Sequence, residues 1–162
     1  GGSGRSTKKG SASAMGHVIP SEAIGVTEIA GRLARALERA YADKGVSIEV
    51  IPSPVEVRVD ERDLMEILGN LVENAAKYSC SKVRVSAEQR DLVRIYVDED
   101  GPGIPPDARQ AVQKRGMRAD TAMPGQGLGL ALVTELVDVY EGSLSIDDSD
   151  MGGARIVVGL PR

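Results

Sequence analysis

Three short polar or glycine-rich stretches constrain the fold of this chain more than any other feature. They are Asn70–Tyr78, Asp98–Ile104 and Gly125–Leu130. A strand-like run separates the first two, and a polar, basic segment separates the last two. Each stretch alone is a weak signal, but their order is difficult to obtain by accident, so we expect all three to line one pocket.

Length and composition favour one domain with an aliphatic core. Of the 162 residues 41% are hydrophobic, yet Phe and Trp are absent and only four Tyr occur, so Leu, Ile, Val, Ala and Met must fill the interior. The net charge of −4 argues against a general nucleic-acid binder, which needs a concentrated positive surface. The single cysteine, Cys80, excludes an internal disulfide and suits a reducing compartment.

The N-terminal residues differ in composition from the rest of the chain. Residues 1–17 have linker composition and are interpreted as an expression tag, so the domain is taken as residues 18–162. No apolar run is long enough to span a bilayer, so this polypeptide is not expected to be membrane-bound.

Hydrophobic periodicity predicts about three helices and several short strands. Helices are expected over 26–44, 61–78 and 128–140, and strands over 46–51, 55–59, 82–87, 92–97, 143–146 and 154–160. Asp60 is a candidate N-cap for the second helix. The pattern breaks down over 101–126, which is expected to be a mobile loop. The predicted fold is α+β, a two-layer sandwich with helices on one face of a mixed sheet.

The first stretch places polar side chains on one face of the second helix. Asn70, Glu73, Asn74 and Lys77 follow the i, i+3, i+4, i+7 spacing. A solvated surface stripe is the plain alternative, but two asparagines inside a helix forgo helix propensity. Amide and carboxylate oxygens are ligands that Mg²⁺ accepts, and a lysine can reach a phosphate oxygen. Asn74 is the first choice as metal ligand, and Asn70 is the second.

The second and third stretches have glycines next to charged groups. Glycines after Asp98-Glu99-Asp100 let the backbone pass close to a flat ligand. A carboxylate at this place can accept a hydrogen bond from the amino group of adenine. Gly125–Gly129 directly precedes a helix, whose N-terminal N–H groups form a common anion site. Plain turns are the alternatives in both cases. Arginines in the segment before it can donate in pairs to phosphate.

Together these stretches resemble the ATP-binding fold shared by sensor histidine kinases, gyrase-type ATPases and Hsp90-type chaperones. The resemblance implies that Asn74 coordinates Mg²⁺, that Lys77 and Tyr78 contact phosphate and nucleotide, and that Glu73 occupies a commonly acidic position. Glu99 falls at the adenine-reading position, where the family has Asp. Either Glu99 reads the base in a shifted position, or Asp98 or Asp100 substitutes for it, or nucleotide affinity is weakened.

Two further details favour the kinases within this group. Asn70 stands where gyrase-type and Hsp90-type ATPases have a Glu that activates water, and an amide cannot accept a proton in that role. Transfer to a neutral imidazole needs no comparable base. The segment Lys114–Gly127 resembles the lid of PhoQ-type sensor kinases, which implies phosphate contacts from Arg115, Arg118 and Gln126. Gly152-Gly153 resembles the family's last glycine box and is interpreted as a tight strand connection.

The resemblance therefore implies the Mg·ATP-binding catalytic domain of a two-component sensor histidine kinase. ATP or ADP and Mg²⁺ are the expected ligands. The phosphoacceptor histidine is expected on a separate dimerisation domain, because His17 lies in the presumed tag. A response regulator is the expected downstream partner, and the domain is expected to be a monomeric, cytoplasmic part of an inner-membrane sensor. A non-catalytic nucleotide-binding module and an anti-sigma-type serine kinase are the alternatives.

The expected site residues are drawn from all three stretches. Those expected in catalysis are Asn70, Glu73 and Lys77. Those expected to bind ATP are Asn70, Asn74, Lys77, Tyr78, Glu99, Gly101, Gly103, Ile104, Arg115, Arg118, Gln126, Gly127, Leu128 and Gly129.

Overall fold

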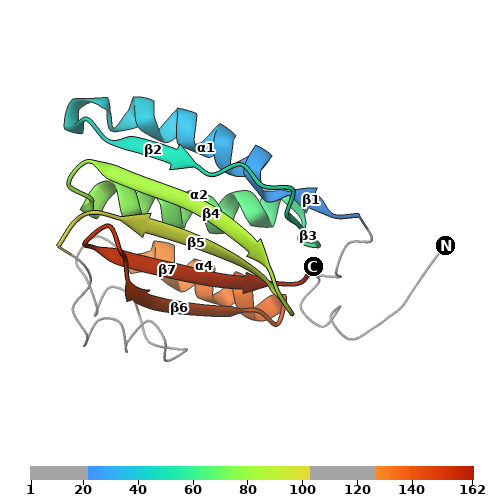
Figure 1. The fold of residues 1–162 in the computed structure, drawn as a ribbon. Coiled ribbons are helices and arrows are strands. Elements are labelled where there is room, and N and C mark those ends of the chain that lie inside the picture. Colours follow the sequence, from blue (N-terminus) through green and yellow to red (C-terminus); the bar gives the residue numbers. More distant parts are fainter. Residues whose placement is uncertain (1–21, 103–126) are drawn as a thin grey trace.

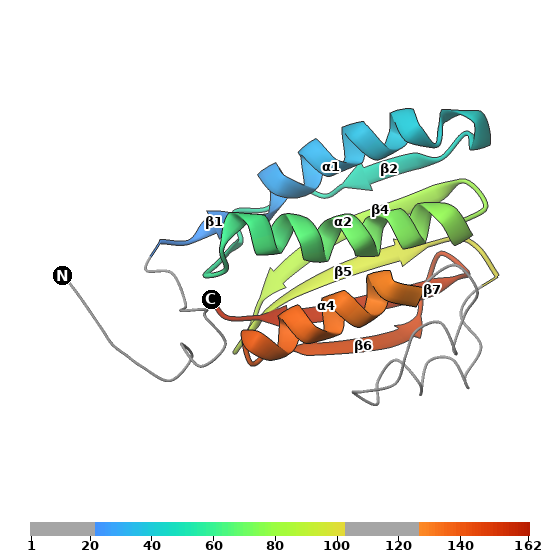
Figure 2. The same cartoon turned by 180° about the vertical axis from the view of Figure 1, so that it is seen from behind.

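A five-stranded mixed sheet with helices on one face forms the body of the protein. The computed structural model describes residues 22–102 and 127–162. Figure 1 views the sheet from its open face, and Figure 2 shows α2 and α4 lying across the opposite face. The predicted α+β sandwich is confirmed, while the loop expected over 101–126 lies almost entirely outside the described residues.

The helices begin and end close to the residues that the sequence predicts. They are α1 (Val26–Ala40), the 3₁₀ turn η2 (Ala42–Lys44), α2 (Glu61–Tyr78) and α4 (Gly127–Val139). Gly45 follows η2 with φ of 75°, a left-handed conformation that favours glycine. The Asp60 side chain accepts a hydrogen bond from the Arg62 backbone N–H at 2.9 Å, which confirms the predicted N-cap of α2.

The strands pair in the order β2-β4-β5-β7-β6. Their bounds are β2 (Ser47–Val50), β4 (Lys82–Gln89), β5 (Val93–Glu99), β7 (Ala154–Leu160) and β6 (Ser143–Asp148). Only the β2–β4 pair is parallel in this sheet, and the other three pairs are antiparallel. A separate two-stranded sheet pairs β1 (Ile24–Gly25) with β3 (Glu56–Val57). The sequence does not predict β1, because two residues carry no periodic signal.

The core is aliphatic, as the composition predicts. Leu64, Ile67, Leu68 and Leu71 of α2 are each 0% exposed and face the sheet. Helix α4 is buried on one side only. Leu130, Val133 and Val137 are buried, but Leu132 is 38% exposed. One side of α4 is buried and the other is exposed, although the exposed side carries leucine as well as acidic residues.

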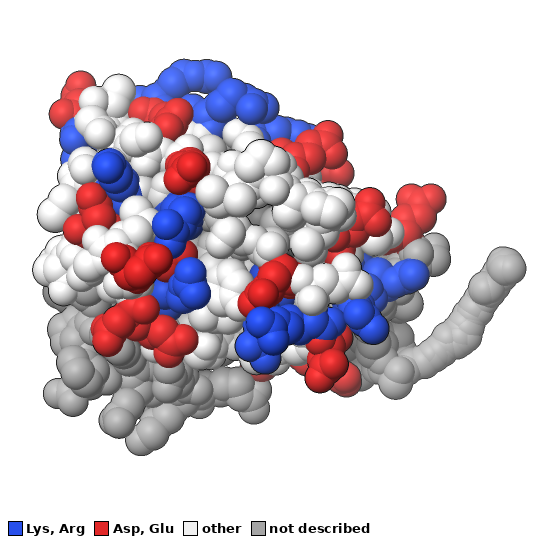
Figure 3. All heavy atoms as spheres, in the orientation of Figure 1, with Lys and Arg blue, Asp and Glu red and all other residues white. Residues whose placement is uncertain are grey.

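The open face of the sheet carries a row of alternating charges. The register aligns Glu49, Arg84, Asp98, Arg155 and Asp147 across the five strands. Asp98 is 0% exposed, and the Arg155 side chain donates from Nε to its Oδ1 at 2.8 Å. Opposite charges on neighbouring strands stabilise one register, because a one-residue slip would move every member to the other face. Figure 3 shows both signs of charge mixed over this face.

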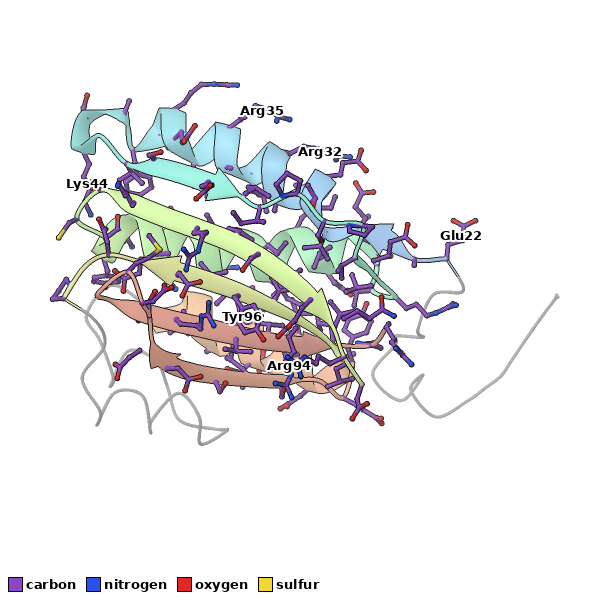
Figure 4. The ribbon with its side chains drawn as sticks, viewed as in Figure 1. Glu22, Arg32, Arg35, Lys44, Arg94 and Tyr96 are labelled. Carbon is purple, nitrogen blue, oxygen red and sulfur yellow. The ribbon has the colours of Figure 1, made fainter. Side chains whose placement is uncertain are left out.

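Two more contacts support this row. The Ser149 hydroxyl donates to Asp98 Oδ1 at 2.8 Å, and the Arg155 guanidinium lies 4.4 Å from the centroid of the Tyr96 ring. Figure 4 labels Tyr96 and, two residues before it on β5, Arg94. Asp98 therefore has several donors, and Arg155 contacts both an anion and an aromatic face.

No helix within residues 22–102 and 127–162 combines the length and apolarity needed to cross a bilayer.

Replacing Arg155 with Met tests the contribution of this ion pair. Removing one partner leaves the Asp98 carboxylate buried with weaker compensation, so we expect the free energy of unfolding to fall by about 3 kcal/mol. Urea unfolding followed by circular dichroism measures it. Arg90→Met is the matched control, because Arg90 and Glu88 pair with side chains 60% and 39% exposed, and it should cost less than about 1 kcal/mol. Equal losses would contradict the role of the row.

Candidate functional site

The candidate site is a hollow where the C-terminal half of α2 faces the ends of two central strands. The side chains and backbone that line it come from α2, β5 and β7 and are Asn74, Ala75, Tyr78, Val97, Glu99, Ala154 and Ile156. The first two stretches singled out in the sequence therefore meet, although more than twenty residues of chain separate Asn74 from Glu99.

Asn74 is the polar side chain of α2 that enters this hollow. Its side chain is buried, with 6% of the residue exposed, and its Nδ2 has no hydrogen-bond partner among the described residues. A buried amide group without a partner is costly and therefore uncommon. The oxygen and nitrogen of an amide can exchange places by a flip, so either can face a ligand. This orphaned amide fits a site that is completed by a bound cation and anion.

Three consecutive carboxylates at the end of β5 point in three different directions. Asp98 lies on the open face with Arg155 and Ser149. Glu99 lies in the hollow, is 5% exposed, and accepts hydrogen bonds from the backbone N–H groups of Gly101 at 2.5 Å and Ala154 at 2.9 Å. Glu99 is thus the acidic residue that faces the hollow, and Asp98 and Asp100 do not line it.

Asp100 fastens the end of β5 to the connection between α2 and β4. Its Oδ1 accepts hydrogen bonds from the backbone N–H groups of Cys80, Ser81 and Lys82 at 2.9, 3.0 and 3.0 Å. Burial acts to raise the pKa of Asp100, but these donors and the Ser81 hydroxyl outweigh it, so the pKa lies below its ordinary value. The Asp100 carboxylate therefore binds the backbone of the α2–β4 connection and not the hollow.

Gly101 is required by a close approach of two backbones. A Cβ at this position would lie 2.0 Å from the carbonyl oxygen of Tyr78, the last residue of α2. No side chain fits between the two segments. The loop after β5 therefore passes directly beneath the end of the helix that carries Asn74 and Tyr78.

The polar stripe of α2 is divided between two surfaces. Tyr78 lines the hollow with Asn74, and burial raises the pKa of its hydroxyl. Asn70 instead donates from Nδ2 to the Glu66 carbonyl oxygen at 2.7 Å, and Glu73 accepts from the Tyr41 hydroxyl at 3.3 Å. Asn70 and Glu73 line a separate groove of about 420 Å³ between α1 and α2. The structure therefore does not bring them into the hollow, and Lys77 is exposed at the helix end.

The third stretch is described only in part. Gly127, Leu128 and Gly129 form the first turn of α4, so a helix does begin where the glycine pattern predicts it. The expected contacts from Gly103, Ile104, Arg115, Arg118 and Gln126 lie outside the described residues.

Two contributors to the site carry no side-chain signal in the sequence. Ala154 supplies a backbone N–H to Glu99, and neighbouring Gly153 lies against the same residue, since a Cβ there would lie 2.5 Å from the Glu99 carbonyl oxygen. Gly153 also closes the β6–β7 turn, where its carbonyl oxygen accepts from the Ser149 N–H at 2.8 Å. Lys44 of η2 binds the C-terminal end of α2, donating from Nζ to the carbonyl oxygen of Ala76 at 2.9 Å.

Comparison with known proteins decides the family. The sequence model of the family described as histidine kinase-, DNA gyrase B-, and HSP90-like ATPase matches residues 59–162. The chain belongs to this family. The family and the fold predicted from the three stretches are thereby confirmed.

Within this ATPase family the similarity is to sensor histidine kinases. The chain is 40% identical over 149 residues to the virulence sensor histidine kinase PhoQ of Salmonella typhimurium, covering 91% of this chain and 31% of that protein. It is 44% identical over 124 residues to the two-component sensor PhoQ of Pseudomonas aeruginosa, covering 75% of this chain and 28% of that protein. The chain thus spans about a third of the length of the curated relatives it matches.

Solved structures agree with the sequence comparison. The mycobacterial sensor histidine kinase MprB aligns with a TM-score of 0.71 at 33% identity, covering 86% of this chain and 96% of that one. The ATP-binding domain of PrrB from Mycobacterium tuberculosis aligns with a TM-score of 0.70 at 30% identity, covering 86% and 95%. This chain therefore matches nearly the whole of both solved chains.

The pKa of Asp100 predicts a pH dependence of stability. A depressed folded-state pKa stabilises the protein above the unfolded value of about 3.9, and this contribution is lost as pH falls through the folded pKa. Asp100→Asn should lower the free energy of unfolding by roughly 2 kcal/mol at pH 7 and by much less near pH 2. Urea titrations at both pH values measure it. Asp91→Asn, in the exposed β4–β5 turn, is the control, and a pH-independent loss in Asp100→Asn would refute this assignment.

Proposed function

We propose that this chain is the Mg·ATP-binding catalytic domain of a two-component sensor histidine kinase, which transfers the γ-phosphoryl group to a histidine on a separate dimerisation domain. The observation that supports it best is the hollow shared by Asn74, Tyr78 and Glu99, where a buried amide lacks a partner. Family membership and the similarity to sensor kinases supply the reaction class.

Each end of the hollow has a proposed role toward the nucleotide. Glu99 accepts a hydrogen bond from the exocyclic amino group of adenine, and Gly101 lets the loop after β5 pass against the end of α2 beside the base. Tyr78 packs against the nucleotide, and Lys77, one turn beyond Asn74, reaches a phosphate oxygen. The remaining proposed ATP contacts come from the segment after β5 and from the start of α4. They are Gly103, Ile104, Arg115, Arg118, Gln126, Gly127, Leu128 and Gly129.

We expect the phosphates of the nucleotide and water to supply most of the ligands of the proposed metal ion. Within residues 22–102 and 127–162, no group of three or more His, Cys, Asp or Glu side chains is arranged to hold a metal ion. Mg²⁺ commonly keeps several waters and binds through one or two protein oxygens and substrate phosphates. The Asn74 amide oxygen would be the protein ligand, with Asn70 as a second candidate after a change of rotamer. Bound Mg²⁺ would neutralise charge on the phosphates.

The chemistry of position 70 favours transfer over hydrolysis. An imidazole nitrogen of the acceptor attacks the γ-phosphorus, the bond to the bridging oxygen breaks, and ADP leaves with the electron pair while the imidazole releases its proton. Neutral imidazole is nucleophilic without a strong base. Asn70 cannot deprotonate water, and Glu73 is engaged by the Tyr41 hydroxyl outside the hollow. Glu73 is exposed on α2 outside the hollow, so its proposed catalytic role is to contact the incoming acceptor.

The partners follow from this reaction. The acceptor histidine is expected on the part of the protein that precedes this domain, and the phosphoryl group then passes to a response regulator. Because ATP is available inside the cell, we place the domain on the cytoplasmic side of the inner membrane, as a monomeric unit within its parent sensor.

Asn74→Ala tests the metal role. Wild-type protein should bind ATP more tightly with Mg²⁺ than with EDTA, and Asn74→Ala should lose at least about tenfold in affinity with Mg²⁺ while changing little in EDTA. Isothermal titration calorimetry measures both. Glu135→Ala, on the exposed face of α4, is the control. A loss of equal size with and without Mg²⁺ would argue against coordination by Asn74.

Mixing the chain with its separately produced acceptor domain and γ-labelled ATP tests the reaction. We expect acid-labile label on the acceptor domain, and slow release of free phosphate when the catalytic domain is alone. ATP binding without transfer would favour a regulatory module instead. Rapid steady-state phosphate release by the isolated domain would contradict the role assigned to Asn70.

A further inference from the structure

We propose that Glu99 closes the base-binding hollow of this domain by binding its own backbone, so that it lowers nucleotide affinity and an aspartate at this position would raise it. This inference rests on the proposed function, because it names the residue that sets the affinity of that same hollow.

The first observation is that the Glu99 carboxylate is held from two sides. Its Oε1 accepts from the Gly101 N–H at 2.5 Å, and its Oε2 accepts from the Ala154 N–H at 2.9 Å. Gly101 follows Glu99 in the chain, and Ala154 begins β7, the strand paired with β5, so the carboxylate connects the loop after β5 to the start of the neighbouring strand. Hydrogen bonds to a carboxylate are stronger than those between neutral groups, and the bridge is therefore a specific contact that a ligand has to replace.

The second observation is that two glycines lie against the Glu99 carboxylate. A Cβ on Gly101 would lie 2.7 Å from Glu99 Oε1, and a Cβ on Gly153 would lie 2.7 Å from the same oxygen. The atoms nearest to these two Cβ positions are the carbonyl oxygens of Tyr78 and Glu99, at 2.0 and 2.5 Å, so close backbone approach requires both glycines and the carboxylate fits beside them. Two glycines and one backbone donor thus form a slot for the side chain of Glu99.

The third observation is the size of the remaining hollow. About 10 Å³ is left among Asn74, Tyr78, Glu99 and their neighbours, which is barely enough for one water molecule. A purine is many times larger. The Glu99 carboxylate must therefore leave at least one of its two N–H donors before a base can enter, and the free energy of that contact is subtracted from the free energy of binding.

An aspartate should behave differently for a geometric reason. Its side chain is one methylene shorter, so it cannot reach both N–H groups from the same backbone position. It retains a carboxylate that can accept a hydrogen bond from the amino group of the base. The contact that competes with the base is lost, while the group that reads the base is kept.

The test compares ATP affinity of the wild-type protein and the Glu99→Asp variant by calorimetry. The aspartate variant no longer has to break one hydrogen bond between its carboxylate and the backbone when ATP binds. ATP binding should therefore tighten by roughly tenfold. Glu49→Asp makes the same chemical change at an exposed position of β2, and its affinity should equal that of the wild type. Circular dichroism of each variant shows that the fold is retained.

Amide hydrogen exchange supplies a second readout in the absence of nucleotide. The Ala154 amide should exchange faster in Glu99→Asp than in the wild type, because its acceptor is lost, while amides in the middle of β5 and β7 should be unchanged. Equal or weaker ATP binding by Glu99→Asp, or unchanged protection at Ala154, overturns this inference. Absence of ATP binding by both proteins instead overturns the proposed function, so the two failures are distinguishable.

Discussion

Three consecutive carboxylates at the end of the central strand β5 hold the sheet, the hollow and the α2–β4 connection in one arrangement. Successive side chains of a strand point to opposite faces. Asp98 therefore lies on the open face and Glu99 on the helical face, and Asp100 lies just beyond the strand end. Each carboxylate accepts hydrogen bonds from a different kind of donor. Asp98 accepts from an arginine and a hydroxyl, Glu99 from the backbone next to it and at the start of β7, and Asp100 from the backbone of the α2–β4 connection.

These contacts connect stability with the site. The Asp98–Arg155 pair aligns β5 with β7, and this alignment places the N–H of Ala154 opposite Glu99. The bonds from Asp100 draw the loop after β5 toward the end of α2, where only a glycine fits beneath the Tyr78 carbonyl. Lys44 closes the same helix end from the other side. The hollow is thus formed by elements that are held by charged groups outside it.

The sequence predicts much of this structure because its strongest signals are local. The helical stripe of α2, its Asp60 cap and the alternation of β4 and β5 are all patterns of neighbouring residues. The direction of Asn70 is not such a pattern, because the same helical face can turn toward the hollow or toward α1, and the packing of α2 against α1 decides it. The contribution of Ala154 is a backbone N–H, to which its side chain gives no clue. The choice among the three carboxylates likewise needed the register of β5.

Chemical-shift mapping by NMR shows directly whether the hollow binds the nucleotide, because each backbone amide reports on its own surroundings. When Mg·ATP is titrated into the ¹⁵N-labelled protein, we expect the largest shifts at Asn74, Tyr78, Glu99 and Ala154. The backbone amides of Leu33 and Met65, in the groove between α1 and α2, should change little. Shifts concentrated in that groove or on the open face of the sheet, with none in the hollow, would contradict the assignment of the nucleotide site.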